Sequence, residues 1–164
     1  MVAAPTASYL ALMLEYETKI DIDAPAAIVW EVLTDLASWP EWDPYCERIE
    51  AKAGLALGAK LEAFTKLSPG RGFSLKVTTL EPGHRMVWTG GMPLGLFKGQ
   101  RTYLLAAHAE RTHFEMCEVF SGPMLGLIAK SIPDMTEAFD AFAAGLKARA
   151  EQRVRDAVPT RAAS

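Results

Sequence analysis

The segment YETKIDIDAPAAIVWEVLTDL, residues 16–36, predicts a strand followed at once by a helix. In its first half, charged residues alternate with Tyr16, Thr18, Ile20 and Ile22. A period of two residues is typical of a half-buried strand. Asp23-Ala-Pro25 then ends the strand, because Asp can cap a helix and Pro is accepted in its first turn. The following apolar residues have helical spacing (Ile28, Val29, Val32, Leu33, Leu36).

The two prolines in Trp39-Pro-Glu-Trp-Asp-Pro44 limit the next element to a short helix or a turn. Beyond this point, glycine- and proline-containing turns such as Ser68-Pro-Gly70 and Glu81-Pro-Gly83 separate short apolar runs. Regular spacing of this kind predicts an antiparallel meander of six strands, Cys46–Lys52, Ala59–Leu67, Gly72–Leu80, His84–Thr89, Lys98–Ala107 and Thr112–Ser121.

The chain is expected to end in a long helix, because one apolar stripe runs through Met135, Phe139, Phe142, Leu146 and Ala150. Ser131 with Asp134 resembles a capping signal for it. The apolar stretch Pro123–Ile132 can form an earlier helical turn that Pro133 interrupts. The predicted fold class is therefore α+β, with a domain over residues 13–155, an N-terminal extension at 1–12 and a tail at 156–164.

Composition indicates one domain of 164 residues with a net charge of −3, which does not favour nucleic-acid binding. Cys46 and Cys117 lack metal-ligand spacing, so we expect no metal and no cofactor. The sequence leaves a disulfide between them open, and two buried free thiols are the expected case. The segment Met1–Leu12 lacks the basic start of a signal peptide, and no apolar run could span a bilayer. We therefore expect a cytoplasmic protein, either a monomer or a homodimer.

Several motifs resemble the SRPBCC superfamily, whose START-like or birch-pollen-allergen-like "helix-grip" fold includes polyketide cyclase/dehydrase-like members. The similar segments are Ile20–Pro25 with Val29–Asp35, Trp39–Pro44, Leu80–Trp88, and Phe120–Gly122 with Ala148–Ala150. The resemblance implies a seven-stranded curved antiparallel sheet around the C-terminal helix, two short helices between strands 1 and 2, and a ligand cavity between sheet and helix. It does not imply one activity, because a fold hosts many functions.

Alternation along the predicted strands indicates which side chains face this cavity. In Thr112–Ser121 the apolar set points inward and takes Glu118 with it, while Arg101 shares a face with Tyr103 and Leu105 on the preceding strand. An Arg101–Glu118 ion pair is therefore expected, either as a structural pair or as a ligand contact. The full set of candidate ligand-binding residues is Trp42, Trp88, Phe97, Arg101, Tyr103, Leu105, Phe114, Met116, Glu118, Met135 and Phe139.

The loop Gly90–Gly99 contains four apolar residues between glycines, Met92, Leu94, Leu96 and Phe97. Apolar residues on a flexible loop are expected to find cover, either over the cavity or on a partner or membrane. No Gly-x-Ser-x-Gly motif occurs, and none of His84, His108 and His113 is placed as a catalytic base. The missing catalytic set favours binding or transport of an apolar small molecule that is lipid-, sterol- or polyketide-like. A polyketide cyclase/aromatase-like enzyme and a chaperone-activator-type interaction module are the alternatives.

Overall fold

The computed structural model describes residues 13–158 and confirms the predicted α+β, helix-grip architecture. Residues 1–12, predicted to be an extension, and residues 159–164 of the predicted tail lie outside the described part. The elements are β1 (Leu14–Ile22), α1 (Ala26–Thr34), η1 (Leu36–Ser38), α2 (Trp39–Trp42), β2 (Cys46–Glu50), β3 (Lys60–Thr65), β4 (Gly72–Glu81), β5 (Arg85–Gly91), η2 (Pro93–Gly95), β6 (Lys98–His108), β7 (Arg111–Ser121), α3 (Leu125–Ile128), η3 (Ala129–Ser131) and α4 (Thr136–Ala157).

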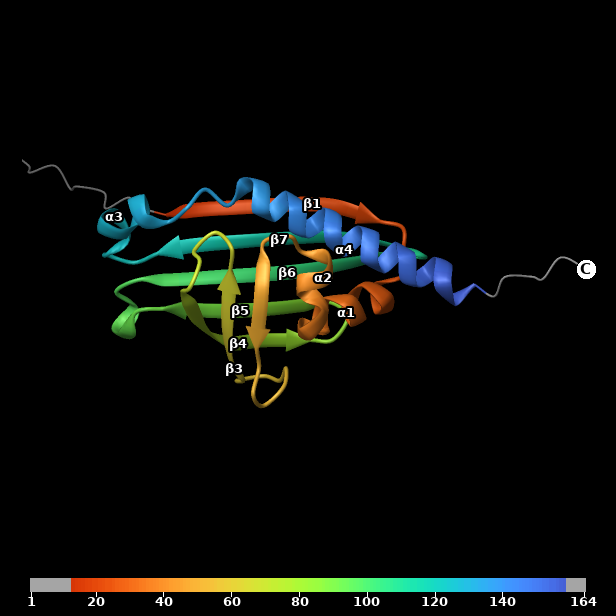
Figure 1. The fold of residues 1–164 in the computed structure, drawn as a ribbon, viewed down its shortest axis with the longest axis horizontal. Helices are drawn as coiled ribbons and strands as arrows, with labels where there is room; N and C mark the ends of the chain where they lie inside the picture. Colours follow the sequence, from red (N-terminus) through yellow and green to blue (C-terminus); the bar gives the residue numbers. More distant parts are fainter. Residues whose placement is uncertain (1–12, 159–164) are drawn as a thin grey trace, which may run out of the picture.

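The seven strands form one antiparallel sheet in the order β1-β7-β6-β5-β4-β3-β2. Strands β2 to β7 follow one another as the predicted meander, and β1 closes the sheet beside β7. Figure 1 shows α4 lying along one face of this sheet over β1 and β7, with α1 and α2 beside one of its ends. The concave face of the sheet and α4 therefore enclose the interior.

Helix α4 is fastened to β1 at three levels. Thr18 Oγ1 donates to Asp140 Oδ1 at 2.8 Å, and Lys147 Nζ donates to the carbonyl oxygen of Asp21 at 2.7 Å. Further along, the Asp23 backbone N–H donates to Glu151 Oε1 at 2.9 Å. The predicted apolar stripe is buried against the sheet, from the N-cap residue Met135 through Phe139, Phe142, Leu146 and Ala150, which confirms these five as core residues.

Two helix caps differ from the sequence-based expectation. Asp23 does not cap α1, because its carboxylate accepts from Arg111 Nε at 2.6 Å, and Pro25 itself occupies the N-cap position without a side-chain bond. Ser131 does not cap α4, because its hydroxyl donates to the Ile128 carbonyl oxygen. Asp134 instead accepts from the Thr136 backbone N–H at 2.9 Å. In both places a tertiary or local partner outcompetes the expected cap.

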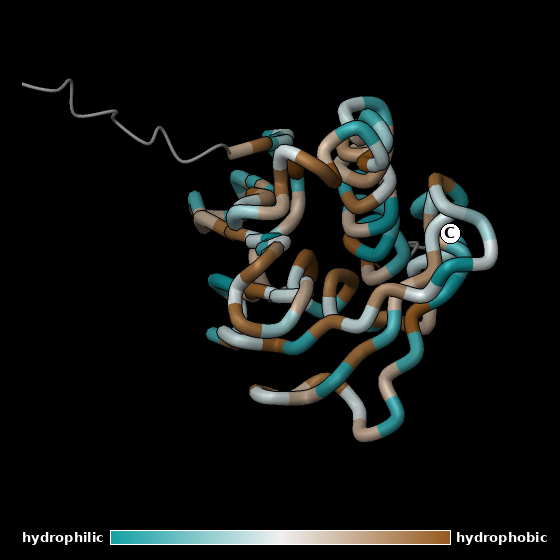
Figure 2. Tube along the Cα trace, turned by 90° about the vertical axis from the view of Figure 1, so that its left-hand side faces the viewer, coloured by the Kyte–Doolittle hydropathy of each residue, from teal (hydrophilic) through white to brown (hydrophobic). Residues whose placement is uncertain are grey.

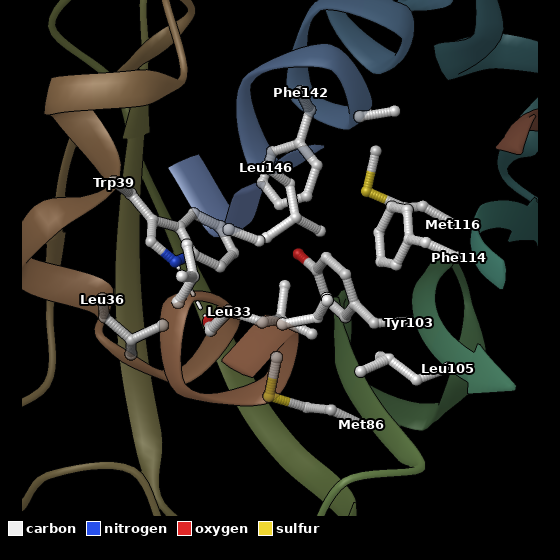
Figure 3. Close-up of a cluster of buried hydrophobic side chains, with 14 of the residues drawn as sticks. Leu33, Leu36, Trp39, Met86, Tyr103, Leu105, Phe114, Met116, Phe142 and Leu146 are labelled. Carbon is white, nitrogen blue, oxygen red and sulfur yellow. Dashed lines mark hydrogen bonds between the residues drawn. The ribbon is translucent and has the colours of Figure 1, made fainter. Parts of the chain in front are cut away.

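An aromatic cluster joins α2, the sheet and α4. The ring of Trp39 stacks on Trp88 at 5.3 Å between centroids and meets Phe142 edge-on at 5.0 Å. Trp39 Nε1 donates to the Leu33 carbonyl oxygen at 3.1 Å, which ties the cluster to the end of α1. Tyr103 fills the space below, with its hydroxyl directed towards Phe142 and Leu146 (Figure 3). This cluster is the closely packed part of the interior.

Close packing of α2 on α4 depends on Gly145. A Cβ atom at this position would lie 2.1 Å from the Trp42 carbonyl oxygen, a backbone atom that cannot move aside without shifting α2. We predict that Gly145→Ala lowers the free energy of unfolding by about 1–3 kcal/mol, although alanine is the better helix former. Urea denaturation measures the change.

The control for this substitution is Ala144→Gly, at the adjacent exposed position. It changes helix propensity without a clash and should cost about 1 kcal/mol. A gain in stability for Gly145→Ala would show that α2 and α4 are not in close contact.

Candidate ligand cavity

A cavity of about 420 Å³ lies between the concave face of the sheet and α4. Residues of β3, β4 and β5 form one wall, β6 and β7 form the floor, and α4 forms the roof. Three segments surround it at one end, the β3–β4 hairpin, the β5–β6 loop and residues 128–135 before α4. At the opposite end it stops at the aromatic cluster, because Trp39, Trp88 and Phe142 line its inner limit.

Strand register places two charged residues of the cavity, Arg101 and Glu118, in one row across the sheet. Trp88 pairs with Arg101, Arg101 pairs with Glu118, and Glu118 pairs with Tyr16. Residues paired in this way project from the same face of an antiparallel sheet. The predicted pairing of Arg101 with Glu118 is thereby confirmed.

The next row towards the mouth contains two glycines. Gly90 pairs with Gly99 between Leu75 and Phe120, so two of the four positions lack a side chain. A Cβ atom at Gly99 would lie 3.0 Å from the Phe120 ring, and one at Gly90 would lie 2.8 Å from the Ser74 carbonyl oxygen. Glycine inside a strand marks such close approaches. Both glycines line the cavity, in the row next to the Arg101–Glu118 pair.

The Arg101–Glu118 ion pair is asymmetric. Both Nε, at 2.8 Å, and Nη2 of Arg101 donate to the same oxygen, Glu118 Oε2. Among residues 13–158, neither Glu118 Oε1 nor Arg101 Nη1 has a hydrogen-bond partner. The side chains are 29% and 13% exposed, so the pair is only partly shielded from the cavity. It can therefore offer one acceptor and one donor to a bound molecule.

The positive charge of Arg101 is permanent. Burial lowers the pKa of Arg101, but the charge and hydrogen bonds of Glu118 outweigh this effect and raise that pKa above its ordinary value. The guanidinium therefore stays protonated and cannot act as a base. Its carbon atom also lies 5.0 Å from the centre of the Phe139 ring, within cation–π range.

Two further polar groups lie on the cavity wall. Asp43 is 8% exposed and accepts from the Tyr45 backbone N–H at 3.0 Å. Burial raises the pKa of Asp43 above its ordinary value, and this hydrogen bond and the charge of Arg101 only partly offset the effect. Trp88 is 1% exposed, and its Nε1 has no hydrogen-bond partner in the described part of the chain. The indole N–H is thus a buried donor without an acceptor.

The cavity brings together part of the predicted site. The residues that line it are Trp88, Phe97, Arg101, Met116, Glu118, Met135 and Phe139. Trp42, Tyr103, Leu105 and Phe114 do not line it. Trp42 packs against Phe142 and Gly145, and the other three fill the core beyond the inner end (Figure 3). Period-two alternation selects the correct face of a strand but does not say how far along that face a cavity extends.

Sequence reasoning missed wall residues from the turn after α2 and from β2, β3 and β4, among them Asp43, Cys46, Phe64 and Phe73. Asp43 belongs to the Trp39–Pro44 motif, where an acidic residue beside a proline is ordinary turn chemistry. Burial is the property that distinguishes Asp43 from an ordinary turn residue, and burial cannot be seen in the sequence.

Both cysteines are free, as predicted. Burial, with a contribution from the Asp43 charge, raises the pKa of the Cys46 thiol to about 11, and burial together with Glu15 raises that of Cys117 to about 12. Neither is an activated nucleophile. Residues 13–158 contain no group of three or more His, Cys, Asp or Glu side chains placed to hold a metal ion. Within the same residues, no helix is long and apolar enough to cross a membrane.

Residues 13–151 match the family model described as polyketide cyclase / dehydrase and lipid transport. Because the match covers most of the chain, the protein belongs to this family. No curated protein sequence matches the chain closely enough to count as a relative.

Solved structures show the same fold at low sequence identity. An aromatase/cyclase, Zhui, from Streptomyces sp. R1128 superposes with a TM-score of 0.70 at 17% identity, covering 91% of this chain and 100% of its own. A START superfamily protein from Mycobacterium smegmatis gives 0.61 at 16%, covering 86% and 98%. Norcoclaurine synthase from Thalictrum flavum, crystallised with a transition-state analogue, gives 0.67 at 14%, covering 88% and 98%. At these identities the likeness establishes the fold.

The first prediction for the site concerns the energetics of the ion pair. Arg101→Met or Glu118→Leu leaves one charge in the cavity wall without its partner. Each should lower the free energy of unfolding by about 1–3 kcal/mol, less than for a fully buried pair because water reaches both side chains. The double variant should be at least about 1 kcal/mol more stable than the sum of the single effects predicts.

The exposed pair Arg48–Glu50, with Nε and Oε1 at 2.9 Å, provides the control cycle. Its coupling energy should stay below about 0.5 kcal/mol. Equal coupling in the two cycles, measured by urea denaturation, would mean that Arg101 and Glu118 are fully hydrated.

The second prediction for the site concerns Cys46. With a pKa of about 11, the thiolate is a very small fraction near neutral pH and grows about tenfold for each pH unit. In a Cys117→Ser variant, the rate of labelling by a thiol reagent should therefore rise about tenfold per unit from about pH 7 to pH 10. A rate that levels off near pH 9 would indicate an ordinary, hydrated thiol.

Proposed function

We propose that this protein binds an apolar small molecule in the cavity and holds its polar end at Arg101 and Glu118. The observation that carries the proposal is a ligand-sized apolar cavity with one free donor and one free acceptor on its floor. Apolar walls with a few placed polar groups are typical of small-molecule sites. Family membership supports the same kind of function.

The wall chemistry favours a ligand with a flat ring. Aromatic side chains border the cavity along its length, from Trp88 and Phe142 at the inner end to Phe97 and Phe120 near the mouth. Phe97 and Phe120 stack at 5.8 Å, so their faces are parallel. Planar rings pack well on such surfaces through offset or edge contacts. A polycyclic, polyketide-like molecule suits this wall better than a single flexible acyl chain.

The polar end of this ligand should carry a carbonyl or hydroxyl oxygen. Arg101 is a permanent donor, and its Nη1 has no hydrogen-bond partner among residues 13–158. A ligand oxygen atom that accepts from Nη1 would gain a charge-assisted hydrogen bond. Glu118 Oε1 can accept from a hydroxyl group of the same ligand.

A second candidate function is cyclisation or dehydration of a polyketide-like chain in this cavity. The observation that favours it is Asp43, a buried carboxyl group on the cavity wall whose raised pKa suits it to proton transfer closer to neutral pH. The similarity to an aromatase/cyclase supports the same direction. Arg101 would then hold the carbonyl oxygen that becomes polarised.

The test of binding uses anilinonaphthalene sulfonate, an aromatic dye, and native mass spectrometry of the protein as purified. Leu75 lies on the cavity wall, so Leu75→Trp should fill the space and weaken dye binding by about tenfold or more. The control is Leu80→Trp on the same strand, where the side chain packs outside this cavity. It should change dye affinity less than about twofold.

Equal effects of the two tryptophan substitutions would place the binding site elsewhere. Mass spectrometry after incubation with a thioester-linked poly-β-ketone separates the two candidate functions. Recovery of the compound with unchanged mass and an unchanged ultraviolet spectrum supports binding alone, because cyclisation without dehydration conserves mass. Loss of water from it, abolished by Asp43→Asn, supports the enzyme.

A further inference from the structure

The open end of the cavity carries exposed apolar side chains on two neighbouring segments. Leu94 is 96% exposed, Leu127 is 78% exposed, and Met92 and Leu96 are 41% and 40% exposed. We call these four residues the apolar rim. Figure 1 places η2 and α3 at the same end of the molecule, and Figure 2, which faces that end, shows hydrophobic segments along the loops towards the viewer.

The two segments of the rim are physically connected. The Met124 backbone N–H donates to the Leu96 carbonyl oxygen at 2.9 Å, and a Cβ atom at Gly122 would lie 2.7 Å from that oxygen. The rim also continues into the cavity, because Met92 and Ile128 from the same segments line it. A surface that contacts the rim therefore faces the entrance used by a ligand.

Folding does not explain the leucine at position 94. Its φ angle of 60° lies in the left-handed region, where a leucine side chain is unfavourable and glycine or asparagine is usual. Its side chain packs on almost nothing. A residue that costs local conformational energy and gains no burial in the monomer is expected to be buried elsewhere.

The surroundings of the rim are basic in an acidic protein. The three segments around the mouth, residues 66–72, 91–98 and 122–135, contain four exposed cations (Lys66, Arg71, Lys98, Lys130) and a single acidic residue, Asp134. Within residues 13–158 none of these cations forms a salt bridge. The whole chain has a net charge of −3, so this positive charge is local.

We propose that the apolar rim docks the mouth of the cavity on the surface of an anionic lipid bilayer. Single aliphatic side chains on separate loop tips suit insertion among lipid headgroups, and lysines beside them are attracted to anionic lipids. A protein interface would be expected to show an aromatic-rich contiguous core and few lysines. This inference concerns where the cavity opens and does not depend on the identity of its ligand.

The experiment measures partition of the full chain, without added ligand, into vesicles of phosphatidylcholine with about one third phosphatidylserine. Vesicles of phosphatidylcholine alone are the reference. The protein should float with the anionic vesicles and bind the neutral ones much more weakly. Leu94→Ser with Leu127→Ser should reduce partition about tenfold or more. Lys98→Gln with Lys130→Gln should reduce it about tenfold to thirtyfold, from about 1 kcal/mol per charge.

Matched controls remove the same kinds of side chain elsewhere. Leu57→Ser with Val158→Ser removes two apolar residues that are 68% and 65% exposed, and Lys52→Gln with Lys60→Gln removes two exposed cations. Both control variants should partition like the unmodified protein. Circular dichroism and thermal melting confirm that each variant is folded.

Three results would overturn the proposal. The first is no preference for anionic vesicles, and the second is an equal loss of partition in the control variants. The third is a dimer in sedimentation velocity that dissociates on Leu94→Ser with Leu127→Ser while vesicle binding is absent, which would make the rim a contact between two copies. Leu75→Trp, which blocks the cavity, should leave partition unchanged, so failure here is distinguishable from failure of ligand binding.

Discussion

The stacking of Trp39 on Trp88 and the edge contact of Trp39 with Phe142 hold three parts of the protein together. Trp39 comes from α2, Trp88 from β5 and Phe142 from α4, so no two of these rings belong to the same element. Aromatic pairs contribute about 0.5–1.5 kcal/mol each beyond the burial of their area. The cluster contacts α4 at Phe142, so it fixes the helix there and leaves room between helix and sheet on the N-terminal side, where Ala138 and Phe139 line the cavity.

The boundary between solid core and cavity falls within a few residues of β6 and β7. Tyr103 and Met116 pair on the inner side of it, and Gly99 and Phe120 pair on the outer side. Arg101 and Glu118 stand between these rows. An ion pair at this position is partly removed from water, and its two charges largely neutralise each other. Arg101 Nη1 and Glu118 Oε1 still have no hydrogen-bond partner among residues 13–158. The same pair can therefore stabilise the floor and contact a ligand.

The sequence predicts the fold well because each element carries a local signal. The alternation in β1, β6 and β7 and the apolar stripe of α4 follow from the periods of the strand and helix backbone. Turn residues mark where the strands end. Inward-facing Arg101 and Glu118 follow from the same alternation. The depth of the cavity does not follow, since Tyr103, Leu105 and Phe114 lie on the correct face but in the space that α2 and α4 fill. Asp43 could not be predicted as a cavity residue either, because its burial depends on tertiary packing and not on a local pattern.

The two ends of the molecule differ because a fold with an internal cavity cannot pack equally well everywhere. At the closed end charges are matched, as in the contact of Arg111 with Asp23, and the aromatic rings are in contact. The open end lies before the first residue of α4, and short segments with exposed leucines form it instead of a long helix. The cations of these segments form no salt bridge within residues 13–158. Segments with few buried contacts open most readily. The open end therefore combines weak local packing with exposed leucines, Leu94 and Leu127, and the proposed contact with a bilayer would supply the burial that the monomer does not give them.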